Sequence, residues 1–440
     1  MRTLKKLFFI VLALLIIVIG GFFALTHQPA IEPAAQPAAG SFAPQQIEKG
    51  KLLAAMGDCA VCHTAPGGTK NTGGLPIASP FGTIYTTNIT PDADTGIGGW
   101  SYEAFERAMR HGVNRDGQYL YPAFPYTSFT HVTDKDMKSL YAYLMTQPAV
   151  KHQPPKTALN FPFNVRPGIA AWNWMYLKKG PLPEDATKPP EWNRGAYIAE
   201  GLGHCSACHT PRDQFAGEKG GSEKFAGSTL DGWSVPALTS KTSAPMPWTA
   251  DDLYAYFKHG FSPRHGSAAG PMAPVIHGLS QQSDADLKAL SSYIMSFKDA
   301  NAQPGDAEAF VAGKFKESKF ALDHDGYRLF EGACASCHSD ATGVKDSMFG
   351  VRPQLALNTN LYSDSPNNAA LVVLNGIQEA ATPTIGTMPA FRHNLSDAQI
   401  ATLLNTMREQ YGLKPWADLP AQVGKLRRDT APSATRLSAH

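Results

Sequence analysis

The pattern Cys-x-x-Cys-His occurs three times in this chain and uses all six of its cysteines. The copies begin at Cys59, Cys205 and Cys334. Two thiols at this spacing can each form a thioether to one vinyl group of a haem, and the histidine that follows then lies under the iron as an axial ligand. The sequence therefore predicts three covalently attached haem c groups in one polypeptide.

The residues assigned to these sites form two sets. The haem-attaching residues are Cys59, Cys62, Cys205, Cys208, Cys334 and Cys337, and the iron-ligating histidines are His63, His209 and His338. Zinc would need four ligands, often from a second Cys-x-x-Cys nearby, whereas each motif here stands alone. Disulfides would not require a histidine after every second cysteine, and no βαβ pattern supports a thioredoxin-like motif. Haem c is the best interpretation.

An electron-carrying haem usually has a second axial ligand, and a methionine thioether opposite the histidine raises the reduction potential. Such a methionine is expected on the loop before the last helix of each haem-binding repeat. Met272 and Met388 hold that place in the second and third repeats, beside prolines that stiffen the loop. We expect both to be iron ligands.

The first repeat departs from this pattern. Phe124 stands where the other two repeats have methionine, and a phenyl ring cannot bind iron. Haem 1 therefore either recruits another residue or stays five-coordinate and open to a small ligand. The candidates for recruitment are Met109, His111 and His131.

The regions around the motifs repeat as well. A glycine opens a helical stretch before each motif, at Gly50, Gly195 and Gly326. An N-cap signal opens an apolar-spaced closing helix in each repeat, at Thr133, Ser283 and Ser396. Middle helices are predicted between Trp100 and Gly112, between Trp248 and Gly260, and from Ser365–Pro366 onward. The predicted fold is mostly α, with three tandem class I cytochrome c domains and an N-terminal transmembrane helix.

The amino terminus has the composition of a membrane segment. Arg2, Lys5 and Lys6 precede an uncharged apolar run, Leu7–Leu25, which as a helix would be roughly 28 Å long, about one bilayer hydrocarbon core. No clear signal-peptidase site follows, so an uncleaved anchor is favoured over a cleaved signal. The positive-inside rule then places the rest of the chain on the periplasmic face of the bacterial inner membrane.

The predicted domain order follows from these features. The segments are an anchor or signal sequence (1–26), a Pro/Ala-rich tether (27–44), cytochrome c domain 1 (45–150), a Pro/aromatic connector (151–190), domain 2 (191–300), a linker (301–317), domain 3 (318–415) and a C-terminal tail (416–440). The aromatic cluster of the connector is expected to cover the seam between two domains, or to face a partner subunit or the membrane. A net charge of +2 without a basic stripe excludes a nucleic-acid partner.

The chain resembles the triple-haem cytochrome c subunits of membrane-bound bacterial dehydrogenases. The most specific stretches are Gly73–Pro76 and Pro80–Pro91. The resemblance implies an electron-transfer subunit, not itself catalytic, that passes electrons from a large catalytic subunit to ubiquinone. The segments Tyr121–Tyr126 and Phe161–Pro167 favour the branch that serves molybdenum-dependent aldehyde dehydrogenases. In that branch, molybdopterin and iron–sulfur clusters belong to partner subunits, one of them a small iron–sulfur protein.

The sequence is also compatible with other functions. The catalytic partner is alternatively a quinoprotein alcohol dehydrogenase or a flavoprotein gluconate or sorbitol dehydrogenase. A five-coordinate haem 1 would suit a haem peroxidase or a gas-binding protein. A freely diffusing periplasmic shuttle is a further alternative, and the apolar run Leu7–Leu25 argues against it.

Overall fold

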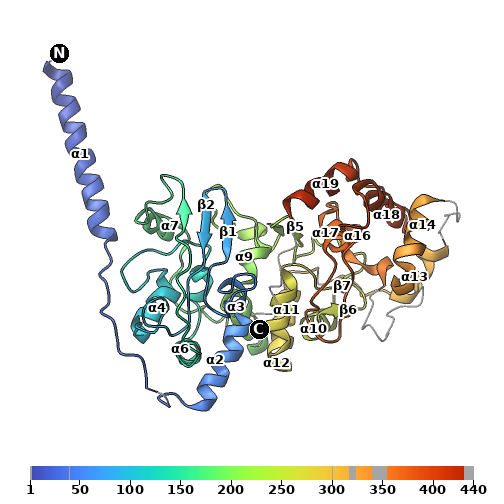
Figure 1. Ribbon diagram of the computed structural model, residues 1–440, viewed down its shortest axis with the longest axis horizontal. Helices are drawn as coiled ribbons and strands as arrows, with labels where there is room; N and C mark the ends of the chain where they lie inside the picture. The colour runs from blue at the N-terminus through green and yellow to red at the C-terminus, as the bar shows by residue number, and fades with distance from the viewer. Residues whose placement is uncertain (1, 39, 300, 317–323, 339–353, 431–440) are drawn as a thin grey trace. The chain divides into compact units, whose positions relative to one another are not determined.

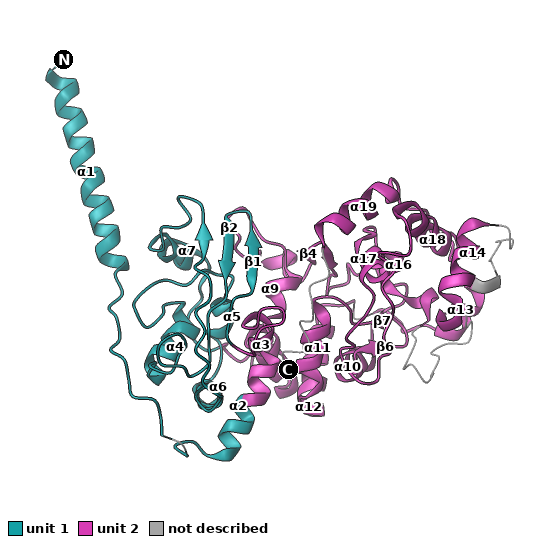
Figure 2. Cartoon of the chain, viewed as in Figure 1, with its two compact units in different colours: residues 1–50, 72–181 teal, residues 51–71, 182–440 magenta. Residues whose placement is uncertain are grey.

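The computed structural model describes residues 2–38, 40–299, 301–316, 324–338 and 354–430, and these are mostly helical (Figure 1). The predicted fold class, mostly α, is confirmed. The chain forms two compact units (Figure 2): residues 1–50 with 72–181, called unit 1, and residues 51–71 with 182–440, called unit 2. The boundaries predicted for three domains stay predictions.

Unit 1 combines helices with one small antiparallel sheet. Its helices are α1 (Arg2–Thr26), most of α2 (Pro44–Met56), α4 (Tyr102–His111), α5 (Tyr126–Phe129), α6 (Asp134–Met145) and α7 (Gly168–Tyr176). Its strands are β1 (Pro76–Ser79), β2 (Gly82–Tyr85) and β3 (Ala158–Leu159), in the order β1-β2-β3.

Unit 2 contains the three Cys-x-x-Cys-His motifs and two-stranded ribbons between its helices. Its helices up to residue 300 are α3 (Cys59–Cys62), α8 (Pro190–Glu200), α9 (Cys205–His209), α10 (Ala250–His259), α11 (Met272–Ser280) and α12 (Asp284–Met295). The later helices are α13 (Ala307–Lys316), α14 (Asp325–Ala333), α15 (Ala335–His338), α16 (Thr359–Tyr362), α17 (Asn367–Asn375), α18 (Asp397–Gln410) and α19 (Leu419–Asp429). The ribbons pair β4 (Ser228–Leu230) with β5 (Trp233–Val235) and β6 (Phe261–Ser262) with β7 (Gly266–Ser267). Two 3₁₀ turns cover Gly221–Glu223 and Leu355–Leu357.

The capping signals read from the sequence are present in the structure. The hydroxyl of Thr133 accepts a hydrogen bond from the amide of Asp136 at the start of α6, and Ser283 starts α12 in the same way. Ser396 and Gln399 form a reciprocal capping box at α18. Each cap satisfies amides that the first turn leaves unpaired, which sets where the closing helix begins.

The opening and closing helices of each repeat pack at one glycine. A Cβ added to Gly50 would lie 1.9 Å from the carbonyl oxygen of Ser139 on α6, and one added to Gly195 would lie 2.0 Å from that of Ala289 on α12. At Gly326 the nearest atom is Oγ1 of a threonine on α18, at 1.9 Å. Only glycine permits helix axes to approach this closely. Each of the three glycines therefore permits the close crossing of an opening and a closing helix.

The hairpin of β1 and β2 was not predicted from sequence. Its register pairs Ile77 with Ile84, and Gly82 has a φ of 127°, a conformation that favours glycine. The strands are only four residues long, too short for alternation to be distinguished from the surrounding loop. Strand β2 lies within the stretch Pro80–Pro91 that carries the family resemblance.

Two predicted loose segments are packed. In the tether, the amide of Ile31 donates to the carbonyl of Arg115 (2.8 Å), and Arg107 donates to the carbonyl of Pro29 (2.8 Å). The segment called a C-terminal tail contains α19, which packs on α17 and α18 and has Val423 fully buried. Apolar residues at helical spacing drive this packing. Residues 431–440 lie outside the described residues.

Candidate haem sites

The second motif has the geometry of a haem-binding histidine. It forms α9, and the Nδ1 of His209 lies 2.8 Å from the carbonyl oxygen of Pro236. A hydrogen bond from Nδ1–H to a carbonyl fixes the tautomer and the ring orientation, which leaves Nε2 as the metal-binding nitrogen. The residues therefore fit a haem whose iron is bound by His209.

The chain around this histidine is held firmly. The amide of Gly227 donates to the carbonyl of His209 (2.8 Å), and the amide of Phe225 donates to the hydroxyl of Thr210 (3.0 Å). Burial lowers the pKa of His209 to about 4, which keeps the imidazole neutral. A neutral imidazole is the form that ligates a metal.

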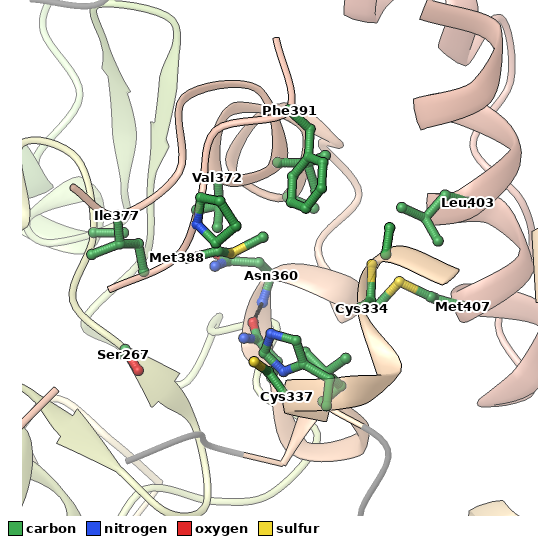
Figure 3. A pocket seen from close by; sticks show the side chains of 18 of the residues that line it. Ser267, Cys334, Cys337, Asn360, Val372, Ile377, Met388, Phe391, Leu403 and Met407 are labelled. Atoms are coloured by element: carbon green, nitrogen blue, oxygen red, sulfur yellow. Dashed lines mark hydrogen bonds between the residues drawn. The ribbon is translucent and has the colours of Figure 1, made fainter. Parts of the chain in front are cut away.

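The third motif opens into an apolar pocket (Figure 3). Cys334, Cys337 and His338 form part of its wall, and Met388 lies across the pocket from the two cysteines. The remaining wall is mainly aliphatic and aromatic, including Val372, Ile377, Phe391, Leu403 and Leu404. An apolar pocket with two thiols, an imidazole and a thioether is the donor set and the surface that haem c requires.

Two methionines, Met388 and Met407, line this third pocket, and they lie on different walls of it. Met388 forms an antiparallel bridge with Ile377, with hydrogen bonds of 2.9 Å in both directions. Met407 projects from α18 and lies beside Cys334, on the wall that carries the motif (Figure 3). Because Met388 lies across the pocket from the cysteines of the motif, it remains the methionine predicted to bind the haem iron.

Met272 is placed differently from the expectation. The sequence suggested a stiff loop, whereas Met272 is the first residue of α11, with Pro271 as the N-cap. Proline is tolerated in the first turn of a helix because the amides there have no intrahelical partner. Pro274 therefore stiffens a helical turn instead of a loop. The assignment of Met272 as an iron ligand stays a prediction.

The first motif packs against the second repeat. Gln282 donates from its side-chain amide to the carbonyl of Leu52 (3.0 Å). A Cβ added to Gly278 would lie 2.2 Å from the carbonyl oxygen of Ala55, and a Cβ on Gly57 would touch the side chain of Leu202 at 3.4 Å. The segment leading to the first motif thus adjoins the turn leading to the second.

Sequence reasoning missed Asp58, the residue before the first motif. Its backbone is left-handed (φ 51°), and its buried Oδ1 has no hydrogen-bond partner. Burial raises its pKa to about 8. His204 holds the equivalent place before the second motif and is also left-handed (φ 34°). A carboxyl directly before the motif was the signal available in the sequence.

The second repeat also contributes to the third pocket. Ser267 and Ala269, in and just after strand β7, line it together with the third motif. The amide of Thr359 donates to the carbonyl of His265 (3.2 Å) across the same boundary. The second repeat therefore contacts the first motif segment on one side and the third pocket on another.

The residues considered for haem 1 belong to unit 1, whereas the first motif belongs to unit 2. Phe124 packs in an aromatic group, with its ring centroid 5.3 Å from that of Phe129. The Nδ1 of His131 lies 2.7 Å from the carbonyl oxygen of Gly180, and Met109 is buried. The sixth ligand of haem 1 therefore keeps all the alternatives stated above.

Disulfides and zinc are the alternative uses of the six cysteines considered above. The structure pairs none of the six cysteines in a disulfide. Within the described ranges, no group of three or more His, Cys, Asp or Glu side chains is arranged to hold a metal ion.

Two family models match this chain. Residues 47–148 and 193–298 match the family Cytochrome c, and residues 321–405 match Cytochrome C oxidase, cbb3-type, subunit III. Cytochrome c domains imply covalently bound haem c, so this part of the cofactor prediction is confirmed.

Several known proteins are similar to this chain over most of its length. The chain is 46% identical over 407 residues to a nicotinate dehydrogenase subunit of Pseudomonas putida, covering 92% of this chain but only 34% of that protein. It is 38% identical to the fructose dehydrogenase cytochrome subunit of Gluconobacter japonicus (83% of this chain, 79% of the relative). It is 36% identical to the gluconate 2-dehydrogenase cytochrome c subunit of Pantoea cypripedii (87% and 90%). The chain thus spans about a third of the first relative and most of the other two.

Proposed function

We propose that this chain, which belongs to the cytochrome c subunits of membrane-bound dehydrogenases, carries electrons through three covalently bound haems from a molybdenum-dependent aldehyde-oxidising subunit to ubiquinone. Its role as an electron-transfer subunit follows from the family. The number of haems, the identity of the catalytic partner and the acceptor are the proposed parts.

Haem groups would supply one-electron chemistry, and residues of the chain would hold them in place. In each motif the two cysteines would form the thioethers and the histidine would bind the iron. In the second repeat, the carbonyl of Pro236 orients the imidazole of His209. Met272 and Met388 would complete the second and third sites, and their thioethers would favour the reduced iron. The apolar wall of the third pocket would keep water from a haem held there, which would also raise its reduction potential.

The observation that carries the proposal is that the second repeat contacts both the segment before the first motif and the third pocket. The second repeat adjoins the segment before the first motif, through Gln282 and Leu52, and lends Ser267 and Ala269 to the third pocket. Haems attached at these places would be neighbours in pairs. Such an arrangement suits passage of electrons along the chain better than three separate sites.

The partner is proposed from similarity. The segment Phe161–Pro167 supports the molybdenum branch, and the nicotinate dehydrogenase relative is more similar to this chain than the fructose or gluconate dehydrogenase relatives are. This branch brings a large catalytic subunit and a small iron–sulfur subunit. A quinoprotein or flavoprotein partner is the alternative.

The location is proposed from α1. It is long and apolar enough to cross a bilayer, and the described part of the chain contains one such helix. Retained as an anchor, it would hold the haem-bearing part at the periplasmic face of the inner membrane, close to ubiquinone.

The test is to purify the tagged chain from solubilised membranes. We expect three haems per chain in the alkaline pyridine spectrum, a large molybdenum-containing subunit in the same complex, and reduction of the haems by an aldehyde. Fewer than three haems, or pigment released into acid acetone, would contradict the haem assignment. A flavin or quinone cofactor in the partner would move the chain to the alternative branch.

Phe124 favours a second candidate, gas binding or peroxidase activity at a five-coordinate haem 1. Carbon monoxide added to the reduced protein distinguishes the two. A stoichiometric change in the spectrum of one haem in three supports an open iron, whereas an unchanged spectrum removes this candidate.

A further inference from the structure

The exposed apolar side chains of this protein gather at one place outside α1. Among the residues that the structure describes, six large apolar side chains beyond α1 are exposed, and five belong to the connector: Phe161, Phe163, Val165, Trp174 and Met175. We call these five the connector surface. The sixth is Phe215, in unit 2. An exposed apolar group of this kind marks a binding surface for another apolar phase.

The connector surface is built on a fixed base. On α7, Ala170 and Asn173 face inward, and Asn173 accepts a hydrogen bond from the hydroxyl of Tyr126 (2.7 Å). This packing turns Trp174 and Met175 outward, with exposed fractions of 67% and 58%. The inward contacts hold the helix in one orientation, so its apolar outer side is a structural feature.

The loop before α7 is held in the same way. Arg166 donates to the carbonyl of Tyr119 (2.7 Å), and its guanidinium lies 4.7 Å from the centre of the Tyr121 ring. The ring of Phe163 lies against that of Phe81, with centroids 4.2 Å apart. Phe161 nevertheless stays 80% exposed.

The end of the apolar helix α1 lies on this surface. The ring of Phe22, one turn before the end of α1, makes an edge contact with the ring of Trp174 (5.9 Å). The hydroxyl of Tyr119 donates to the carbonyl of Thr26, the last residue of α1 (3.0 Å). Tyr119 is also the residue to which Arg166 of the connector is bonded. Helix end and connector are thus joined through one side chain and one ring pair.

The chain is hydrogen-bonded to the rest of unit 1 within a few residues after α1 ends. Pro29 and Ile31 are already hydrogen-bonded to Arg107 and Arg115 of unit 1. Any bilayer that α1 crosses therefore reaches its headgroup level where α1 ends, and the connector surface lies at that level.

From this geometry we propose that the connector surface inserts into the interfacial zone of the bilayer that α1 crosses, with phospholipid as its occupant. The inference rests on the proposed role of α1 as an anchor. Tryptophan is favoured at the membrane–water interface, where its ring meets both phases. Lys178 and Lys179, exposed directly after α7, are placed to meet the phosphates of headgroups. The surface would hold unit 1 against the membrane and limit its tilt.

The experiment uses the intact complex in native membranes that carry a diazirine phospholipid. After irradiation, mass spectrometry maps the lipid adducts. We expect adducts on α1 and on residues 161–175, and none on the peptide that contains Phe215, which is the matched exposed apolar control. Adducts on α1 without adducts on 161–175 overturn the proposal and leave the anchor intact. If the mature protein lacks α1, the anchor proposal fails. Adducts on residues 161–175 then show by themselves whether the connector surface inserts into the bilayer, and their absence overturns the proposal.

A pair of variants distinguishes lipid from a protein partner as the occupant of the connector surface. W174S/M175S should reduce the adducts on residues 161–165 while those on α1 persist, and F215S should change neither. An unchanged haem absorption spectrum shows that each variant has folded. Adducts on residues 161–175 that occur in the isolated chain but vanish in the complex would assign the surface to a partner subunit and overturn the proposal.

Discussion

The second and third repeats each have a methionine as the predicted sixth ligand, but the backbone conformation at that methionine differs. Met272 begins a helix, α11, behind Pro271, whereas Met388 stands in an extended bridge with Ile377. Both methionines precede a closing helix, and both repeats pack that helix on a glycine of the opening helix. The pair of crossed helices is therefore the part of the repeat that stays constant. The segment that carries the predicted sixth ligand differs between the two repeats.

The largest expected effect is a loss of stability when the glycine at the helix crossing is replaced. G195A should lower stability by about 3 kcal/mol, because its new methyl group would meet the backbone carbonyl of Ala289, which cannot move aside. G326A should cost about 1–2 kcal/mol, since it meets the side chain of Thr406 first. Thermal unfolding of the haem-loaded protein measures both.

The matched control is Gly313 on α13, where an added Cβ meets nothing within 4 Å. G313A should leave the unfolding temperature unchanged or raise it, as alanine favours helix. Equal losses at all three glycines would show that the close helix crossing is not the reason for glycine at the first two.

The next effect concerns the two methionines as ligands. M272H and M388H should each lower the reduction potential of one haem, because a thioether favours the reduced iron more than an imidazole does. We expect a fall of at least about 59 mV, a tenfold change in a one-electron couple. A spectroscopic redox titration of three resolved haems measures this. A potential that stays in place in either variant would remove that methionine from the ligand set.

A smaller change separates the two sulfurs of the third pocket. M388A should open one iron and let carbon monoxide bind to the reduced protein, whereas M407A should not, because Met407 lies on the wall beside Cys334. The carbon monoxide difference spectrum records the result. Binding in M407A alone would exchange their roles and would make the third repeat unlike the second.

The smallest effect compares the caps of the closing helices. S283A and S396A should each cost about 1 kcal/mol, since each leaves an amide of the first turn without its acceptor. S396A should cost the more of the two, because it also breaks the capping box with Gln399. Urea unfolding midpoints give the comparison, with exposed Ser240 changed to alanine as the neutral reference. A reversed order would show that the box adds nothing.

The sequence by itself determined the chemistry and the helices that depend on local signals. Cysteine spacing specifies thioether attachment because the reacting atoms are a few residues apart, and N-caps mark the closing helices because their hydrogen bonds are local. The three opening glycines were visible as a repeat, although their reason was not. The apolar composition of α1 likewise needs no tertiary context.

Only the tertiary structure decided how distant segments meet. The bond from His209 to Pro236, the position of Met272 in a helix and the packing of Gln282 on Leu52 join residues that no local pattern relates. The same holds for α7, where inward contacts of Asn173 determine that Trp174 faces outward. Long-range packing made these choices, because local preferences are weaker than the free energy of burying a side chain.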